Sequence, residues 1–276
     1  MDIAELNKVS NELRRMIVEV SLKTGAHHIG SAFSCIDILT ALYFNIMNLD
    51  GDLKKSSNKD WFLLSKGHAA LAQYAVLAKR GYFEIADLFE EFLSDGGLLG
   101  GHPDRHSVPG IEMSSGSLGH GLSVGAGVAM VAKIDNSAKR VFILLGDGEC
   151  NEGMVWEAAL FASQRKLDNL LAIIDYNRLQ GFGSTDQVLS LEPLKNKFQS
   201  FGWSVKEIDG HDMHELIESM SELPFAAGKP SVLIANTVKG KGSAVLEDKL
   251  ESHYLVIDNE LRDKIISDLN SESNAL

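Results

Sequence analysis

The sequence predicts an α/β protein in which a mostly parallel sheet carries helices on both faces. Three short apolar runs lead to this fold class: VFILLG at 141–146, LLAIIDY at 170–176 and SVLIANT at 231–237. Continuous apolar runs of this length are typical of strands that are buried on both faces, as in a parallel sheet. Segments of helical periodicity separate the runs, and such crossovers place helices over both faces of the sheet.

The remaining elements follow from apolar periodicity. Apolar residues recur at steps of three and four between Ile3 and Leu22, which predicts an amphipathic helix that ends at Gly25. A weaker strand is expected over 203–208, and the Gly- and His-rich stretch 96–121 is expected to be irregular. Further helical segments are predicted over 34–47, 69–79, 155–165, 214–222 and from about residue 259.

Composition indicates an ordinary globular chain. The 276 residues are 45% hydrophobic and 23% charged, without repeats or linkers, so we expect one domain over 1–276. The net charge of −12 argues against a nucleic-acid-binding module. Two cysteines are too few for a disulfide framework or a zinc cluster and indicate a reducing, cytoplasmic compartment. No signal peptide is visible and no stretch approaches the roughly 18 apolar residues of a membrane span, so no membrane contact is expected.

Two loops that follow predicted strands carry the residues with the clearest chemistry. Gly146, Asp147 and Gly148 end the first apolar run, and Asn177 follows the second. If the two strands are neighbours, Asp147 and Asn177 lie side by side where parallel sheets bind ligands. Carboxylate and amide oxygens, completed by phosphate oxygens, suit Mg²⁺ or Ca²⁺, and glycines let a diphosphate approach the backbone. The alternative is a simple turn in which Asp147 caps the next helix.

Histidines form a second group of candidates. Six lie in the first half of the chain, four of them in motifs that also contain glycine: His27, His28, His68, His102, His106 and His120. Imidazoles in flexible loops can bind phosphate or sugar hydroxyls and can transfer protons near neutral pH. The alternative for any single histidine is a surface or capping role. The sequence has no P-loop and no dinucleotide-binding glycine motif after a strand, which argues against those two classes.

Taken together, these segments resemble the thiamine diphosphate enzymes and, in particular, transketolase. Gly-Asp-Gly with an Asn about thirty residues later resembles the cofactor signature of that superfamily. Five further segments are similar to transketolase: AHHIGSAFSCIDILTALY, FLLSKGHAALAQYA, GGHPD, SSGSLGHGLSVGAGVAM and NTVKGKGSAVLED. The resemblance covers nearly the whole chain and only the diphosphate-binding (PP) module of the family. The family's pyrimidine-binding and C-terminal modules have no counterpart here.

The resemblance implies a role for each matching residue. The metal, Mg²⁺ or Ca²⁺, would be held by the side chains of Asp147 and Asn177 and by the carbonyl of Leu179. The catalytic residues facing the substrate channel would be His28, His102 and His253, with His27 as an alternative to His28. Thiamine diphosphate would be bound by His68, Gly116, Ser117, Leu118, Gly146, Asp147, Gly148, Glu152, Asn177 and His253. Glu152 could equally be a first-turn acid favoured by the helix dipole.

The implied activity is the transfer of a two-carbon ketol unit from a ketose or ketose phosphate to an aldose. The glutamate that activates the cofactor lies in a module absent from this chain, so the resemblance implies a split transketolase completed by a second chain, as an α₂β₂ assembly. The alternatives are half of a deoxyxylulose-phosphate synthase-like or 2-oxoacid dehydrogenase-like enzyme, and a non-catalytic cofactor-binding module. Departures from the family motifs at His27, His120 and Tyr254 could accompany an unusual sugar, such as a branched, deoxy or sulfonated one.

Overall fold

The computed structural model describes residues 1–49 and 59–273, and within these ranges it contains one sheet of five parallel strands. The strands are β1 (Trp61–Leu64), β2 (Val141–Gly146), β3 (Leu170–Tyr176), β4 (Ser204–Asp209) and β5 (Ser231–Asn236). Their order across the sheet is β1-β2-β3-β5-β4. The predicted fold class is confirmed, because the three apolar runs form β2, β3 and β5 and the weaker run forms β4 at an edge.

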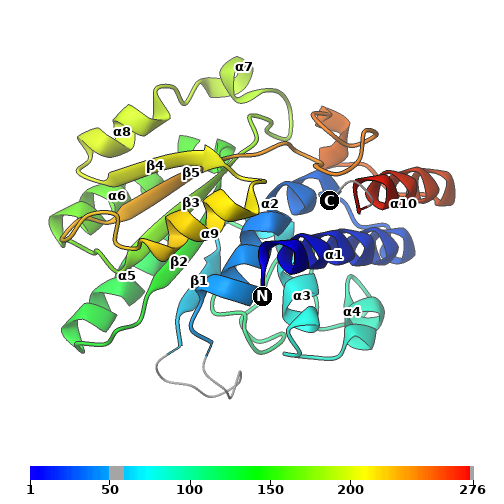
Figure 1. Ribbon diagram of the computed structural model, residues 1–276, viewed down its shortest axis with the longest axis horizontal. Coiled ribbons are helices and arrows are strands. Elements are labelled where there is room, and N and C mark those ends of the chain that lie inside the picture. The colour runs from blue at the N-terminus through cyan, green and yellow to red at the C-terminus, as the bar shows by residue number, and fades with distance from the viewer. Residues whose placement is uncertain (50–58, 274–276) are drawn as a thin grey trace.

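Helices cover both faces of this sheet (Figure 1). They are α1 (Ile3–Thr24), α2 (Ile29–Ala41), α3 (Ala70–Lys79), α4 (Ile85–Glu91), α5 (His120–Ile134), α6 (Gly153–Gln164), α7 (Thr185–Leu189), α8 (Leu194–Ser200), α9 (Met213–Ser221) and α10 (Asn259–Ser273). Short helical turns complete the order: the π-helix η1 (Leu42–Ile46) and the 3₁₀ turns η2 (Gly67–Ala69), η3 (Gly148–Asn151) and η4 (Leu250–His253).

Successive residues of each central strand enter different hydrophobic clusters. In β2, Phe142 and Leu144 pack into a cluster with residues of α1, α2, α3 and α9. Ile143 and Leu145 pack instead into a second cluster with residues of α5, α6 and α8. Because side chains alternate across a strand, the sheet divides the interior into two layers. The helices cover the two faces of the sheet, so the loops that follow the strands lie along its carboxyl edge.

Five elements were not predicted: the strand β1 and the helices α4, α5, α7 and α8. β1 is a four-residue strand directly before the turn η2, and its short apolar run cannot be told from the start of a buried helix by periodicity. α5 begins inside the stretch that was expected to be irregular. It was not predicted because its glycines lower the helix propensity of this segment. A Cβ added at Gly125 would lie 2.2 Å from Cδ1 of Ile143, so glycine here allows α5 to approach the sheet closely.

Most predicted helix ends are close to those observed. α1 ends at Gly25, which adopts the left-handed conformation with φ of 66°. α2 begins at Ile29, five residues earlier than predicted, because His28 takes the left-handed conformation with φ of 68° and so starts the helix. The helices predicted at 155–165 and 214–222 are α6 and α9, each shifted by one or two residues.

The helical stretch Ile29–Ile46 is long and apolar enough, by length and composition alone, to cross a membrane. The expectation that no segment approaches such a span was therefore wrong. This stretch is α2 with η1, and 89% of it is buried inside the protein, so it forms the centre of the first hydrophobic cluster.

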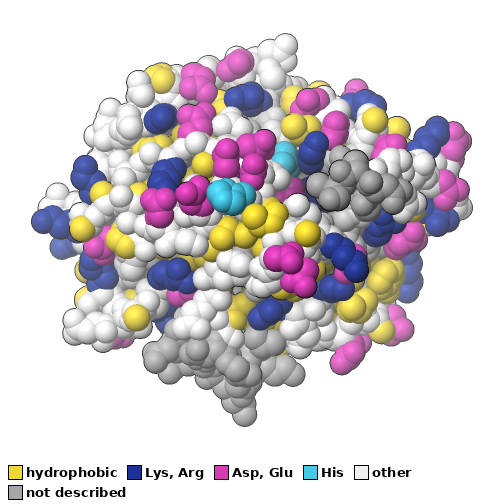
Figure 2. Space-filling model, viewed as in Figure 1, with side chains coloured by type: hydrophobic (Ala, Val, Ile, Leu, Met, Phe, Trp, Pro, Cys, Tyr) yellow, Lys and Arg dark blue, Asp and Glu magenta, His cyan; other side chains and the backbone are white. Residues whose placement is uncertain are grey.

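On the face drawn in Figure 2, acidic and basic side chains are interspersed among polar ones.

Candidate functional site

A cavity of about 550 Å³ opens at the carboxyl ends of β1, β2 and β3. Nine of the residues predicted for a site line it: His68, Leu118, Gly146, Asp147, Gly148, Glu152, Asn177, Leu179 and His253. Four others are not among the lining residues: His28, His102, Gly116 and Ser117. His28 adjoins the cavity, since its ring lies 4.9 Å from that of His253, and Ser117 directly precedes the lining residue Leu118. His102 lies further out, 6.5 Å from the ring of His28, and a Cβ at Gly116 would lie 3.6 Å from the ring of His102.

Asp147 joins the two strand-end loops. The strands β2 and β3 are neighbours, as the prediction required, and Asp147 follows Gly146 at the end of β2. Its Oδ1 accepts a hydrogen bond from the N–H of Gly148 at 2.7 Å, and its Oδ2 accepts one from the N–H of Arg178 at 2.5 Å. Asp147 therefore caps the turn η3, as in the alternative interpretation, and also contacts the loop that carries Asn177. Burial and the neighbouring Asp175 raise the pKa of Asp147 to about 6.

The amide of Asn177 has a fixed orientation. Its Nδ2 donates to Oγ of Ser34 at 3.4 Å and to Oδ2 of Asp175 at 3.5 Å. Its Oδ1 accepts from the N–H of Leu179 at 3.1 Å, so the oxygen faces the loop that lines the cavity. Asp175 is fully buried and also accepts from Lys66 and Thr237. This buried carboxylate thereby sets which end of the Asn177 amide is available to a ligand.

Two buried lysines lie at the cavity: Lys66 lines it, and Lys239 lies behind the lining residues Leu179 and His253. Lys66 forms an ion pair with Asp175, which raises the pKa of the lysine although its burial acts in the opposite direction. Lys239 is 1% exposed, and its Nζ donates to the carbonyl of Leu179 at 3.0 Å and lies 2.9 Å from Nδ1 of His253. Burial and the nearby Lys66 lower the pKa of Lys239 to about 8. The carbonyl of Leu179, predicted to bind a metal, is thus also within reach of an ammonium group.

The histidines cluster as the sequence suggested, and His28 rather than His27 lies at their centre. The His28 ring is 5.5 Å from that of His68 and 6.5 Å from that of His102. Burial, followed by the charges of His102 and His27, lowers the pKa of His28 to about 4. Burial lowers the pKa of His253 to about 3 and that of His68 well below its usual range. These imidazoles are therefore neutral near pH 7.

Two histidines whose roles were left open lie outside the cavity lining. His27 is exposed, and its Nδ1 lies 2.9 Å from the carbonyl oxygen of Tyr254. His120 is exposed at the first residue of α5, with Nδ1 3.1 Å from the carbonyl oxygen of Leu118. Both contacts are to the backbone of cavity-lining residues, so each histidine supports the wall of the cavity from outside.

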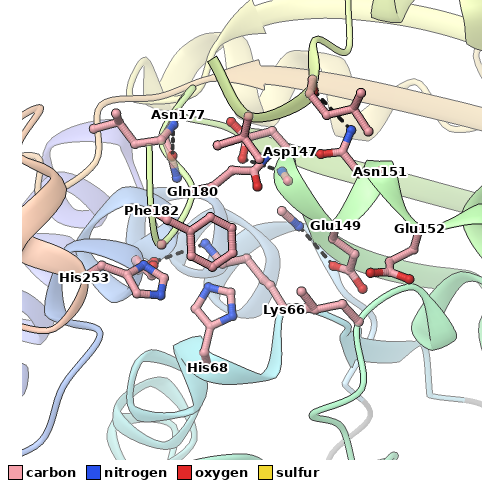
Figure 3. Close-up of a pocket in the computed structure, with 18 of the residues that line it drawn as sticks. Lys66, His68, Asp147, Glu149, Asn151, Glu152, Asn177, Gln180, Phe182 and His253 are labelled. Carbon is pink, nitrogen blue, oxygen red and sulfur yellow. Dashed lines mark hydrogen bonds between the residues drawn. The ribbon is translucent and has the colours of Figure 1, made fainter. Parts of the chain in front are cut away.

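Histidine and glutamate side chains lie on different sides of this cavity (Figure 3). His68 and His253 lie on one side and the acids Glu149 and Glu152 on the other, with Phe182 across the front. The Glu152 side chain makes no capping hydrogen bond to α6, which leaves it directed to the cavity. Within the part of the chain that the structure describes, no group of three or more His, Cys, Asp or Glu could hold a metal ion. A metal here would depend on the oxygens of Asp147 and Asn177 and on those of a ligand.

Sequence reasoning did not find Lys66, Lys239, Asp175 or Glu149. One signal was available for Asp175, which is a lone acid within the apolar run LLAIIDY. In a strand buried on both faces, such an acid requires a buried cationic partner. Lys66 precedes the predicted ligand His68 by two positions and is that partner.

Comparisons with known proteins identify the family of the chain. Residues 6–266 match the family described as transketolase, thiamine diphosphate binding domain. One of the subunits of the apulose-4-phosphate transketolase of Phocaeicola vulgatus is 41% identical over 278 residues, covering 100% of this chain and 98% of that protein. The 6-deoxy-6-sulfo-D-fructose transketolase subunit SqwG of Clostridium sp. is 39% identical over 268 residues, covering 97% of each.

A solved structure shows the same fold within a longer chain. The transketolase of Campylobacter jejuni superposes with a TM-score of 0.89 at 28% identity. The superposition covers 99% of this chain and 43% of that chain, so this chain spans less than half of its length. Relatives and fold agree with the resemblance to transketolase and do not favour the other thiamine diphosphate enzymes. The chain therefore belongs to the transketolase family, as a member of its thiamine diphosphate-binding domain.

Proposed function

We propose that this chain is the diphosphate-binding subunit of a two-chain transketolase, which transfers a two-carbon ketol unit from a ketose or its phosphate to an aldose. One observation carries the proposal: Asp147 and the oriented Asn177 amide lie at neighbouring strand ends in a cavity that the buried Lys66 also lines. Oxygen ligands next to buried cations are what a complex of a divalent metal with a diphosphate requires.

The residues present fit the cofactor and its metal. Asp147, Asn177 and the Leu179 carbonyl would hold Mg²⁺ or Ca²⁺, with phosphate oxygens completing its coordination. Lys239, His68 and His253 would face the diphosphate. Position 148 has little room for a side chain, since a Cβ there would lie 2.8 Å from Cγ of Gln180. Glycine therefore leaves the backbone at this position open to a diphosphate. When bound, thiamine diphosphate supplies the carbon nucleophile and the electron sink for breaking and forming the C–C bond.

The contribution of this chain to catalysis is then binding, orientation and proton transfer. His28, His102 and His253 adjoin one another beside the cavity, and the lowered pKa values of His28 and His253 keep both imidazoles neutral. A neutral imidazole can donate a hydrogen bond to one sugar hydroxyl and accept the proton of another. Phe182 at the front of the cavity would help to exclude water from the reacting atoms.

A second chain would supply what this one lacks. The chain matches 43% of the length of the Campylobacter transketolase, and the Phocaeicola relative is itself named as one subunit of its enzyme. Phe182 and Tyr254, which line the cavity, are 76% and 57% exposed, and Leu189 beside them is also exposed. Large apolar side chains at the mouth of a site are typical of surfaces that a partner covers. We infer an α₂β₂ assembly in the cytoplasm, with the pyrimidine-binding and C-terminal modules on the partner.

The substrate is inferred from the relatives. One is named for apulose 4-phosphate and the other for 6-deoxy-6-sulfo-D-fructose, and neither is named for an ordinary pentose phosphate. The motif departures at His27, His120 and Tyr254 lie in or next to the cavity wall. We therefore infer that the ketose donor is an unusual sugar, and a panel of branched, deoxy and sulfonated ketoses would identify it.

The direct test is reconstitution. The chain, co-expressed with a neighbouring gene product that has a pyrimidine-binding module, should catalyse ketol transfer only when both thiamine diphosphate and Mg²⁺ are added. Asp147→Ala should lower cofactor affinity at least about tenfold, because it removes a metal ligand. The exposed Asp95→Ala variant is the matched control and should bind normally. A complex that binds no cofactor would overturn the proposal, whereas cofactor binding without transfer would contradict only the proposed substrate.

A further inference from the structure

The side chain of Glu149 is a cavity-lining carboxylate for which the proposed reaction has no direct use. It is 3% exposed and lies in the turn η3, directly after Gly148. Its Oε1 accepts hydrogen bonds from Oγ of Ser65 and, at 2.8 Å, from the N–H of Gly119. Its Oε2 accepts one from the N–H of Gly146 at 3.1 Å (Figure 3). Both oxygens therefore accept hydrogen bonds from groups of this chain.

The three donors come from three different elements. Ser65 follows the end of β1, Gly119 is the N-cap of α5, and Gly146 ends β2. Oγ of Ser65 in turn accepts from the N–H of Gly121, which extends the network by two residues within the first turn of α5. One carboxylate thus satisfies the first free N–H of α5 and binds it to two strand ends.

This network joins two loops that each contribute residues to the cavity wall, Leu118 from one and Gly146, Asp147 and Gly148 from the other. The loop 116–118 runs directly into Gly119, and the strand-end loop 146–148 runs directly into Glu149. A Cβ at Gly121 would lie 2.3 Å from Oγ of Ser65, and one at Gly119 would lie 2.7 Å from Cβ of Glu152. The start of α5 is therefore packed closely against Ser65 and Glu152, while the carboxylate of Glu149 holds Gly119 and Gly146 by hydrogen bonds.

We infer that Glu149 is a positioning residue that sets the spacing between the loop 116–119 and the diphosphate loop 146–148. The inference rests on the proposed function and on what the resemblance to transketolase implies, that Gly116, Ser117 and Leu118 would line the ring end of thiamine diphosphate while the loop 146–148 faces its diphosphate. Only a group that accepts on both oxygens fits the site. In Glu149→Gln the amide NH₂ must face a donor in either orientation, the N–H of Gly119 or that of Gly146.

The test compares two probes on the full chain by titration calorimetry, each with Mg²⁺: thiamine diphosphate and inorganic pyrophosphate. Glu149→Gln should lower the affinity for thiamine diphosphate about tenfold, the effect of one unsatisfied polar contact, and change that for pyrophosphate less than about twofold. Pyrophosphate should be less sensitive because it would contact the loop 146–148 alone and would not depend on the distance from that loop to the loop 116–119. Glu157→Gln, an exposed glutamate on α6, is the matched control and should bind both probes normally.

Equal losses for both probes, or none for either, would overturn the inference. If the unmodified chain binds pyrophosphate but not thiamine diphosphate, with or without its partner, the proposed function fails instead. The positioning role is then judged by amide hydrogen exchange, which should quicken at Gly119 and Gly146 in Glu149→Gln. Should that variant not fold, Ser65→Ala removes one donor to Glu149 together with the acceptor of the Gly121 N–H, and slower exchange or no change at Gly119 would contradict the inference.

Discussion

His28 is surrounded by lysines and by other histidines. The groups that face it are Lys66, Lys239, His27, His68, His102 and His253. Its protonation is opposed by burial and by these charges, so its pKa in the folded chain is about 4 against 6.5 for the free side chain. Between these two values the unfolded chain binds a proton that the folded chain does not. This contribution of His28 to stability is therefore present above pH 6.5 and is lost as the pH falls toward 4.

The lowered pKa of His28 predicts how the stability of the chain changes with pH. The difference in unfolding free energy between the unmodified chain and His28→Asn should increase from about pH 5 to about pH 7.5, measured by urea unfolding. Asparagine is the chosen replacement because it tolerates the left-handed backbone at this position. Taking the difference also removes the opposite effect of Asp147, whose raised pKa favours folding at lower pH. A pH-independent difference would contradict the assignment.

Residues whose roles depend on spacing along the chain could be predicted, whereas those whose partners are distant could not. Asp147 and Asn177 follow adjacent apolar runs, so their proximity was predictable from the parallel order of two strands. Lys66 reaches Asp175 across 109 positions and Lys239 reaches Leu179 across 60. Nothing in a linear pattern pairs such residues, since only the crossover connections bring them together.

At the scale of elements, α5 provides a matched pair of glycines. A Cβ at Gly125 would lie 2.2 Å from Cδ1 of Ile143 in β2, whereas one at Gly127 would meet nothing within 4 Å. Gly125→Ala should therefore destabilise the chain by ~1–3 kcal/mol through overpacking. Gly127→Ala should stabilise it by ~0.5–1 kcal/mol, because alanine favours the helix.

Chemical denaturation of both variants at one pH is the measurement, with the slope of the unfolding curve checked for constancy. Two variants of equal stability would show that α5 does not approach the sheet as closely as described. The same close approach explains why α5 was not predicted. Its glycines are selected by the distance to β2, a tertiary requirement that overrides the helical propensity visible in the sequence.

The apolar pattern of the sequence predicts the long buried strands but not the short one. β2, β3 and β5 are six or seven residues long and buried on both faces, so each forms an apolar run that stands out in the sequence. β1 has four residues and merges into the turn that carries His68, which hid it. The order of strands across the sheet, with β4 beyond β5, required the structure.

At the scale of the molecule, exposed apolar side chains are concentrated in two places. One is the cavity mouth with Phe182 and Tyr254. The other is the outer side of α5 and α6, where Val131, Ile134 and Leu160 are exposed. We expect the purified chain to self-associate and co-expression with its partner to prevent this.

Light scattering coupled to size-exclusion chromatography measures this association. The double variant Ile134→Glu, Leu160→Glu should shift the isolated chain toward the monomer, because two charges interrupt the apolar side of α5 and α6. Asn196→Glu with Gln199→Glu adds the same charge on the exposed side of α8 and should have little effect. A monodisperse monomer of the unmodified chain would contradict the expectation.

The division of the interior by the sheet has a consequence for how disturbances spread. Ile143 and Leu144 are adjacent in sequence, yet they report on separate layers, one toward α5 and α6 and the other toward α1, α2 and α3. Isotope-labelled methyl groups at these two positions would act as independent sensors of each layer. Since the candidate site lies along the common edge of both layers, the two signals together would reveal whether ligand binding stiffens one layer or both.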